Sequence, residues 1–357
     1  MQTFLKILRW SVGLLFIFSG LIKANDPLGL SYKMQEFFDV WGINFLSDYT
    51  LAFALVMNTL EIVAGIALLI QFPYKQTLWL LLGLIIFFTF LTGYAYFSGK
   101  IKTCGCFGDC IPLTPKTSFI KDILLLLLSI IILLFNHKKS KANTHKAVGI
   151  IVLLISIVGV GYGQNYVLQY LPLVDCLPYK TGNDIVEKMQ KPAGAIADSI
   201  SIQMEFEKEG KLFSFDANHF PDNFDSTFIY KNRKEVIISK GNGLQAAIVE
   251  FELNTMNGED TTQSLFATTT PYVLVFAGKI ESSVPWENLL TKLHQKYKLL
   301  YIVTSDKQGV NAFLSKESIL IGDITMIKTA ARVWPTIFIM NGSTIMQKKS
   351  YLDYLEK

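Results

Sequence analysis

The sequence predicts an α-helical membrane bundle followed by an extramembrane α/β domain, and three observations support this fold class. The composition is that of a membrane protein: 51% of the 357 residues are hydrophobic and only 17% are charged, whereas soluble domains average about 25% charged. Five apolar stretches in the first half are long enough to cross a bilayer. The second half shows the alternating strand and helix patterns of an α/β layer fold.

Each of the five predicted spans has about the 20 apolar residues that a helix needs to cross the hydrocarbon core. The first begins with basic residues, as a signal peptide would, but its length and the lack of a small-x-small cleavage site favour a span that is retained. In the fourth, Lys121 and Asp122 lie near the start, and we expect both to snorkel to the interface. The predicted spans cover 4–24, 49–70, 77–97, 117–135 and 147–166.

The Lys and Arg residues of the connections predict the orientation of these spans. Lys6 and Arg9 in the first span, Lys75 in the second turn and a basic cluster at 137–146 lie on one side. On the other side, acidic residues dilute the basic ones. We therefore expect a multi-pass protein of the inner (cytoplasmic) membrane, with a cytoplasmic N-terminus and a periplasmic C-terminal domain. The lipid bilayer is one expected partner; nucleic acid is not, since no basic stripe with interleaved aromatic residues appears.

Four cysteines form the most informative motif. Cys104, Cys106 and Cys110 lie in the connection after the third span, and Cys176 follows the fifth. Because every span crosses the membrane once, both segments must lie on the same side, where an oxidising compartment would allow disulfides. Three interpretations stay open: a catalytic site in which Cys104 and Cys106 exchange with Cys110 or Cys176, two static disulfides, or a metal cluster. No metal is predicted, because zinc-type C-x-x-C pairs and a nearby histidine are missing from this loop.

Glu61 lies in the middle of the second span, where a charged carboxylate costs at least a few kcal/mol. If it is ionised it needs a partner, and Arg9 on the first span is the nearest candidate by residue count; if it is buried alone, it stays protonated. The alternative is a helix-packing hydrogen bond, with Asn58 on the same helix face and Gly65 allowing close approach.

After the fifth span the composition becomes that of a soluble α/β protein. Leu171-Pro172 and Leu177-Pro178 indicate a linker at the start of a β-rich segment over 171–248, with strands expected at 201–206 and 235–239. A further domain is expected over 249–357. Its predicted elements are a buried strand at 272–277, a helix at 285–297, a strand at 298–303, a helix at 310–316 and a last hairpin over Asn341-Gly342.

The segment from Val249 to Tyr351 resembles the thioredoxin/peroxiredoxin-like fold. The matching pieces are Val249-Glu-Phe-Glu-Leu, Asn257-Gly258 and Arg332-Val-Trp-Pro335-Thr-Ile-Phe-Ile. The resemblance implies a cis-proline at Pro335 that faces the active-site thiols of the family. However, residues 278–286, where those thiols would lie, contain no cysteine, and the thiolate is the nucleophile of thiol exchange. We therefore expect a thioredoxin-like domain that lacks CxxC and serves for docking.

The membrane half resembles the DoxX/MauE family. Its pieces are Leu8-Arg-Trp-Ser-Val-Gly-Leu-Leu-Phe-Ile-Phe-Ser-Gly-Leu-Ile-Lys23, Glu61-Ile-Val-Ala-Gly-Ile-Ala-Leu and, most specifically, Cys104-Gly-Cys-Phe-Gly, which favours MauE. The resemblance covers a four-helix unit at 1–136; residues 137–170 add a basic cytoplasmic loop and the fifth span. MauE-like proteins are linked to methylamine utilisation, through maturation of a disulfide-rich dehydrogenase subunit, and DoxX relatives to quinone-linked sulfur oxidation. The fifth span and the thioredoxin-like tail depart from plain MauE.

The resemblance implies a redox-associated membrane protein. The favoured hypothesis is a thiol–disulfide oxidoreductase that oxidises or matures an extracytoplasmic client protein and passes electrons to a quinone near Glu61. The layout is also similar to that of the quinone-coupled disulfide oxidases of the DsbB and VKOR type, by architecture alone. The alternative is a non-enzymatic assembly factor with structural disulfides. A solute transporter centred on Glu61 is less favoured, because no inverted repeat is visible.

Overall fold

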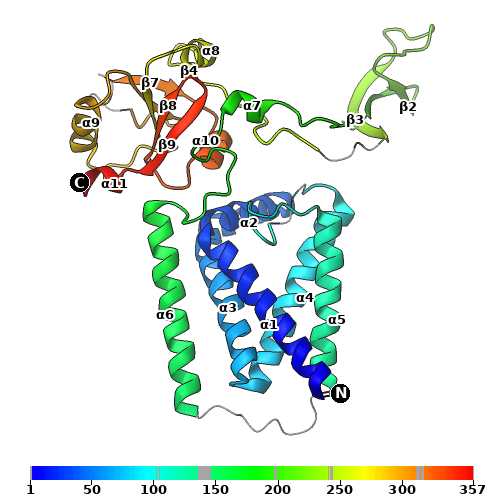
Figure 1. Ribbon diagram of the computed structural model, residues 1–357. Helices are drawn as coiled ribbons and strands as arrows, with labels where there is room; N and C mark the ends of the chain where they lie inside the picture. Colours follow the sequence, from blue (N-terminus) through cyan, green and yellow to red (C-terminus); the bar gives the residue numbers. More distant parts are fainter. Residues whose placement is uncertain are drawn as a thin grey trace. The chain divides into compact units, whose positions relative to one another are not determined.

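The computed structural model describes residues 2–101, 103, 105–135, 146–196, 199–239, 241, 244–310, 314 and 317–356. Within them, five helices are long and apolar enough to cross a membrane, and each contains one predicted span. A mixed α/β region follows, so the predicted fold class is confirmed (Figure 1). The five helices are α1 (Gln2–Asn25), α3 (Thr50–Ile70), α4 (Tyr74–Ser98), α5 (Pro115–Phe135) and α6 (Lys146–Tyr170).

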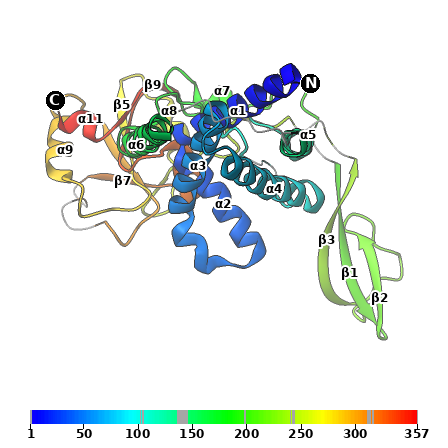
Figure 2. The ribbon, with the colours of Figure 1, turned by 90° about the horizontal axis from the view of Figure 1, so that it is seen from below.

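Helices α1 and α3 form the centre of the bundle. Helix α5 packs on α4 and α1, whereas α6 packs on α3 and α1, so the two lie on opposite sides of the centre (Figure 2). Helix α6 is the most peripheral of the five. Of its most apolar 18 residues, 11% are buried, whereas the corresponding share is 28–44% in the other four helices. Its polar attachment is a pair of amides: Asn58 on α3 donates to Gln164 on α6 at 3.1 Å. Asn58 therefore contributes a helix-packing hydrogen bond, although its partner is Gln164 and not Glu61.

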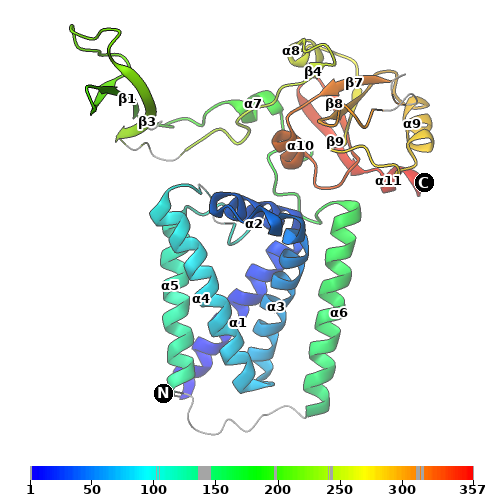
Figure 3. The ribbon, with the colours of Figure 1, turned by 180° about the vertical axis from the view of Figure 1, so that it is seen from behind.

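A shorter helix, α2 (Pro27–Trp41), lies across one end of the bundle (Figures 1 and 3). It begins where Asp26 accepts a hydrogen bond from the Gly29 N–H at 3.0 Å, and it ends at Gly42, whose φ of 70° suits glycine. The 3-10 helix η1 (Asn44–Tyr49) then leads into α3. Helix α4 leads into the connection that contains Cys106 and Cys110, which we call the cysteine loop, and α5 follows it. Both helices meet this loop at the end of the bundle that α2 covers.

Two glycines set the spacing between α1 and α3. A Cβ atom on Gly65 would lie 2.7 Å from the backbone carbonyl oxygen of Gly13, and a Cβ atom on Gly20 would lie 2.5 Å from Ile62. Small residues at such positions let two membrane helices approach closely. The close contact of α1 with α3 matters for the site, because it brings the second half of α1 beside Glu61.

Replacing Gly65 with alanine is expected to lower the free energy of unfolding by about 1–3 kcal/mol, because a backbone carbonyl must move to admit the methyl group. Unfolding in mixed detergent micelles measures this. The matched control is Gly83→Ala in α4, where nothing lies within 4 Å of the added Cβ and helix propensity favours alanine. Equal stability of the two variants would contradict the close-approach argument.

The α/β domain contains a six-stranded sheet in the order β4-β7-β6-β5-β8-β9. Strands β5, β6 and β7 are parallel, and β8 and β9 add to β5 in antiparallel fashion as the predicted hairpin. The predicted helix at 310–316 falls largely outside the described residues, and β7 was not predicted. The strands are β4 (Asn254–Thr255), β5 (Tyr272–Phe276), β6 (Leu300–Thr304), β7 (Ser318–Ile321), β8 (Thr336–Asn341) and β9 (Thr344–Ser350).

Four short helices complete this domain: α8 (Thr262–Phe266), α9 (Trp286–His294), α10 (Ile324–Ala330) and α11 (Leu352–Leu355). Strand β5 is buried along its whole length, as its unbroken apolar sequence predicts. The residues after α6 add to the domain instead of forming only a linker, since Tyr179 is 2% exposed and the Gly182 N–H donates to the Ile345 carbonyl at 2.7 Å. By contact, Met1–Gly182 and Leu253–Lys357 form one unit.

The second unit, Asn183–Glu252, contains α7 (Ile185–Met189) and a three-stranded antiparallel sheet in the order β2-β1-β3. Strands β1 (Ser199–Lys208) and β3 (Ile229–Ser239) contain the two predicted strands, and β2 (Lys211–Asp216) joins them. Its core is aromatic: Phe206 is buried, and its ring lies 4.8 Å from that of Phe224. The β-rich segment was expected at 171–248, whereas this unit covers Asn183–Glu252 and residues up to Gly182 belong to the first unit.

Candidate functional site

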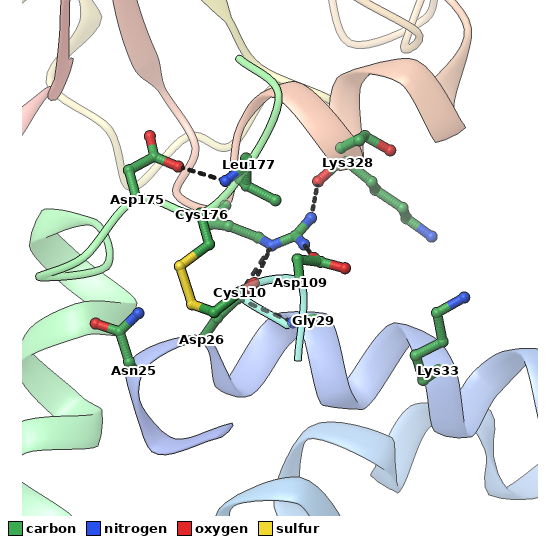
Figure 4. Close-up of polar contacts among 12 residues, drawn as sticks. Asn25, Asp26, Gly29, Lys33, Asp109, Cys110, Asp175, Cys176, Leu177 and Lys328 are labelled. Atoms are coloured by element: carbon green, nitrogen blue, oxygen red, sulfur yellow. Dashed lines mark hydrogen bonds and ion pairs between the residues drawn. A yellow bond between two sulfur atoms is a disulfide. The ribbon is translucent and has the colours of Figure 1, made fainter. Parts of the chain in front are cut away.

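A disulfide joins two of the four predicted cysteines. Cys110, in the connection between α4 and α5, is bonded to Cys176, which follows α6, with their Cα atoms 4.8 Å apart (Figure 4). The two segments therefore lie on the same side of the membrane, as the number of spans requires. Cys104 lies outside the described residues. Cys106 is a free thiol.

The loop that carries Cys106 turns back over the end of the bundle. Gly105 and Gly108 have φ values of 65° and 54°, which glycine adopts readily, and the Gly108 N–H donates to the Gly105 carbonyl at 3.0 Å. Ser19 on α1 donates to the Cys106 carbonyl at 3.2 Å and so fixes the turn to the bundle. The turn places Cys106 and Phe107 at the wall of a pocket between the helices.

This pocket, which we call the bundle pocket, has a cavity volume of about 30 Å³, which is room for one or two water molecules. Most of its walls are apolar. The polar residues among them come from three helices and the loop, although these elements are distant in sequence. The lining residues are Leu15, Phe16, Ser19, Lys23, Glu61, Ile85, Phe88, Cys106, Phe107, Lys121, Asp122 and Leu125.

Glu61 is 1% exposed and forms an ion pair with Lys23, which is 3% exposed. The prediction that Arg9 is this partner was wrong. Arg9 lies nearly four helical turns from Lys23 on α1, and its Nε atom has no hydrogen-bond partner within the described structure. Counting residues along one span favoured Arg9, because it ignores the crossing of α1 over α3. The second oxygen of Glu61, Oε2, is buried and has no partner among the described residues, so the pocket offers a free acceptor.

Asp122 does not snorkel to the interface, as was expected from its place near the end of α5. It is 1% exposed and accepts hydrogen bonds from Thr92 on α4 at 3.0 Å, and it pairs with Lys121 at 2.6 Å. A sequence signal existed: Ser118, Asp122 and Ser129 recur at helical spacing and share the buried face of α5. Because the neighbouring residues along α5 are apolar, the partner of this stripe, Thr92 on α4, could not be predicted.

The electrostatic surroundings keep the Cys106 thiol protonated. Burial raises the pKa of Cys106 above the usual value of a thiol; the Lys121 ammonium opposes this rise, and the Asp122 carboxylate adds to it. Since the thiolate is the nucleophile, the raised pKa lowers the reactive fraction of Cys106 at neutral pH.

Alkylation of Cys106 should therefore start at a higher pH than alkylation of an unperturbed cysteine, whose pKa is about 8.5. Lys121→Gln removes the opposing cation and should move the pH profile upward, whereas Asp122→Asn removes a like charge and should move it downward. Mass spectrometry of the labelled peptide between about pH 7 and pH 10 measures both profiles. Superimposable profiles for the two variants would show that these charges do not act on the thiol.

Two buried cations of the α/β domain pair with aspartates near the disulfide. Arg332 pairs with Asp109 at 2.7 Å and with Asp26 at 2.8 Å, and Lys348 pairs with Asp175 at 2.8 Å. Figure 4 shows Asp26 and Asp109 beside Cys110, and Asp175 beside Cys176. Desolvation lowers the pKa of Lys348, and the Asp175 carboxylate opposes this effect. None of these contacts was indicated by the sequence.

Pro335, the cis-proline candidate, follows a cis peptide bond with Trp334. The segment after β5, where a thioredoxin would have its cysteines, lies opposite: a Cβ atom on Gly278 would be 2.5 Å from the Trp334 ring. This segment contains no cysteine, so it has no thiolate to offer Pro335 or a client.

Residues 1–135 match the family described as methylamine utilisation protein MauE. The chain is also similar to protein TlpB of Flavobacterium psychrophilum, with 25% identity over 193 residues, which make up 52% of this chain and 52% of that relative. The chain thus spans about half the length of the curated relative that it matches. No solved structure matches it significantly. The match over 1–135 covers helices α1 to α5, and therefore all of the residues that line the bundle pocket.

Proposed function

We propose, from the premise that residues 1–135 form a MauE-type membrane segment, that this protein is a membrane thiol–disulfide oxidoreductase that oxidises an extracytoplasmic client protein. One observation carries the proposal: a free thiol, Cys106, lines a pocket inside the bundle, while a disulfide, Cys110–Cys176, lies four residues further along the same loop. This arrangement supplies one cysteine for a membrane-bound electron acceptor and another pair for a client.

In the proposed reaction, a client thiolate attacks one sulfur of the Cys110–Cys176 bond, which breaks, and a mixed disulfide forms. The second client thiol displaces the loop cysteine, so that the client leaves as a disulfide and two thiols remain on this protein. Cys104 and Cys106, when joined as a disulfide, reoxidise that pair by the same exchange. The two electrons and two protons then reside on Cys104 and Cys106.

A quinone, which when bound supplies an acceptor for two electrons and two protons, is the ligand that we propose for the bundle pocket; its ring would enter only if the lining side chains move apart. The apolar walls of the pocket include the rings of Phe16, Phe88 and Phe107. Lys23 offers a donor for a carbonyl oxygen, and the unpartnered Oε2 atom of Glu61 offers an acceptor for a hydroxyl group. These groups would orient the quinone ring beside Cys106. The ion pairs Lys23–Glu61 and Lys121–Asp122 would neutralise each other's charges in the pocket.

We place the protein in the inner membrane with its N-terminus in the cytoplasm, because of the basic cluster between the fourth and fifth spans. The cysteine loop and the α/β domain would then face the periplasm, where disulfides persist. We propose that the α/β domain, which has no cysteine at 278–286, docks the client. The MauE match makes methylamine metabolism one setting for such a client.

The test is thiol trapping of the whole protein in membranes. Membranes are incubated with a reduced dithiol peptide and a soluble quinone, quenched with acid, and labelled so that the state of each cysteine is read by mass spectrometry. We expect Cys110 and Cys176 to cycle, and Cys106→Ser to leave them reduced after one turnover. Arg9→Gln, outside the pocket, is the control.

If the Cys110–Cys176 bond persists unchanged with and without the dithiol peptide, the oxidoreductase proposal is wrong. The result would favour the alternative, a non-enzymatic assembly factor whose disulfide is structural. In that case, the loss of Cys110 and Cys176 would lower the amount of folded protein but leave the oxidation of clients unchanged.

A further inference from the structure

Each cysteine of the disulfide is preceded by an aspartate. Asp109 directly precedes Cys110, and Asp175 directly precedes Cys176. Each aspartate pairs with a different cation of the α/β domain, Arg332 and Lys348, at 2.7 and 2.8 Å. Both cationic side chains are buried, at 6% and 2% exposure. Each of the two ion pairs thus holds the residue next to one cysteine of the disulfide.

The cations are themselves fixed by further contacts. The Arg332 Nε atom donates to both carboxylate oxygens of Asp26, and its Nη1 atom donates to the Lys328 carbonyl at 2.5 Å. The Lys348 ammonium lies over the Phe338 ring, 5.5 Å from its centre. Buried charges that lose a partner are strongly disfavoured, so Lys348 depends on Asp175, whereas Arg332 is held by Asp26 as well as by Asp109.

The membrane helices do not by themselves bring the two cysteines together. Cys110 lies five residues before α5, and Cys176 lies six residues after α6. Helix α5 packs on α4 and α1, whereas α6 packs on α3 and α1. When the disulfide opens, Val174 still forms two hydrogen bonds with Asn25 on α1, at 2.8 and 3.0 Å. The contacts at the aspartates directly before the two cysteines are the ion pairs with Arg332 and Lys348.

We propose that Arg332 and Lys348 are positioning residues that hold Cys110 and Cys176 within bonding distance while their disulfide is open. This inference rests on the proposed function, because it assumes that the bond opens and closes. The thiol-free α/β domain would thereby serve the exchange without a cysteine of its own: it raises the effective concentration of one loop thiol at the other. Re-formation of the bond would need no redocking of either segment.

The test is a redox titration of the full-length protein in membranes, in glutathione buffers of stepped ratio, with the Cys110–Cys176 state read by thiol labelling. Asp109→Asn and Asp175→Asn are the main variants, because they remove each ion pair from the loop side and leave the core of the α/β domain intact. We expect each to make the bond about tenfold easier to reduce, since a hydrogen bond to a charged group is lost. Arg332→Gln combined with Asp109→Asn should add little to either change alone.

The control is Arg233→Gln, which breaks the exposed Arg233–Glu235 pair of the second unit and should leave the titration midpoint unchanged. Unchanged midpoints in both aspartate variants would overturn the positioning role. A wild-type bond that resists every glutathione ratio would overturn both this inference and the proposed exchange. A bond that titrates, and shifts in the variants, but oxidises no client peptide would contradict the proposed function alone.

Discussion

Replacing Glu61 with glutamine is expected to lower the free energy of unfolding by about 3–5 kcal/mol, because it leaves the Lys23 ammonium buried without a counter-charge. Lys23 is 3% exposed and lies at the end of α1 beside the Phe88 ring, 4.5 Å from its centre, so it has no short route to water. Unfolding in mixed detergent micelles measures the loss.

The double variant Lys23→Met, Glu61→Leu should recover most of this stability, since apolar residues of similar volume often replace a buried ion pair without loss. It should nevertheless remain inactive if Glu61 and Lys23 orient a quinone, and this separates their structural contribution from their functional one. The matched control is Glu36→Gln, which breaks the half-exposed Lys33–Glu36 pair on α2 and should cost less than about 1 kcal/mol. A Glu61→Gln protein as stable as this control would show that the pair is not ionised.

Replacing Cys110 and Cys176 together with alanine is expected to lower the free energy of unfolding by about 2–4 kcal/mol. The bond closes a separation of 66 residues, for which chain entropy alone predicts about 4 kcal/mol in water. The bilayer already restricts α5 and α6 in the unfolded state, so the lower part of the range is expected.

Cys106→Ala is the comparison for this prediction, because it removes a thiol of the same loop and leaves the disulfide intact; it should cost no more than about 1 kcal/mol. Digestion by an added protease, followed over time, gives a second measure, since a less stable junction is opened and cleaved more often. If the double alanine variant unfolds and digests like the wild type, the ion pairs alone hold this junction.

The membrane helices are the part of the fold that could be predicted from the sequence. Every predicted span became a helix, and each extends only a few residues beyond its predicted bounds, because hydrophobic length is a local property that the bilayer reads directly. The hairpin over Asn341-Gly342 and the buried strand at 272–277 were likewise predictable, since turn residues and apolar runs act over a few positions. Strand β7 was not predicted, because its apolar run, Ile319-Leu320-Ile321, is only three residues long.

The candidate site shows the limit of the sequence. It determined that four cysteines share one side of the membrane and that Glu61 needs a partner inside it, because span number and hydrophobic cost follow from sequence alone. Only the tertiary structure decided which cysteines bond, that Lys23 rather than Arg9 meets Glu61, and that Asp122 faces inward. Pairing across helices depends on crossing geometry, here on the close approach of α1 and α3 at Gly13 and Gly65, and residue spacing along one helix carries no record of that geometry.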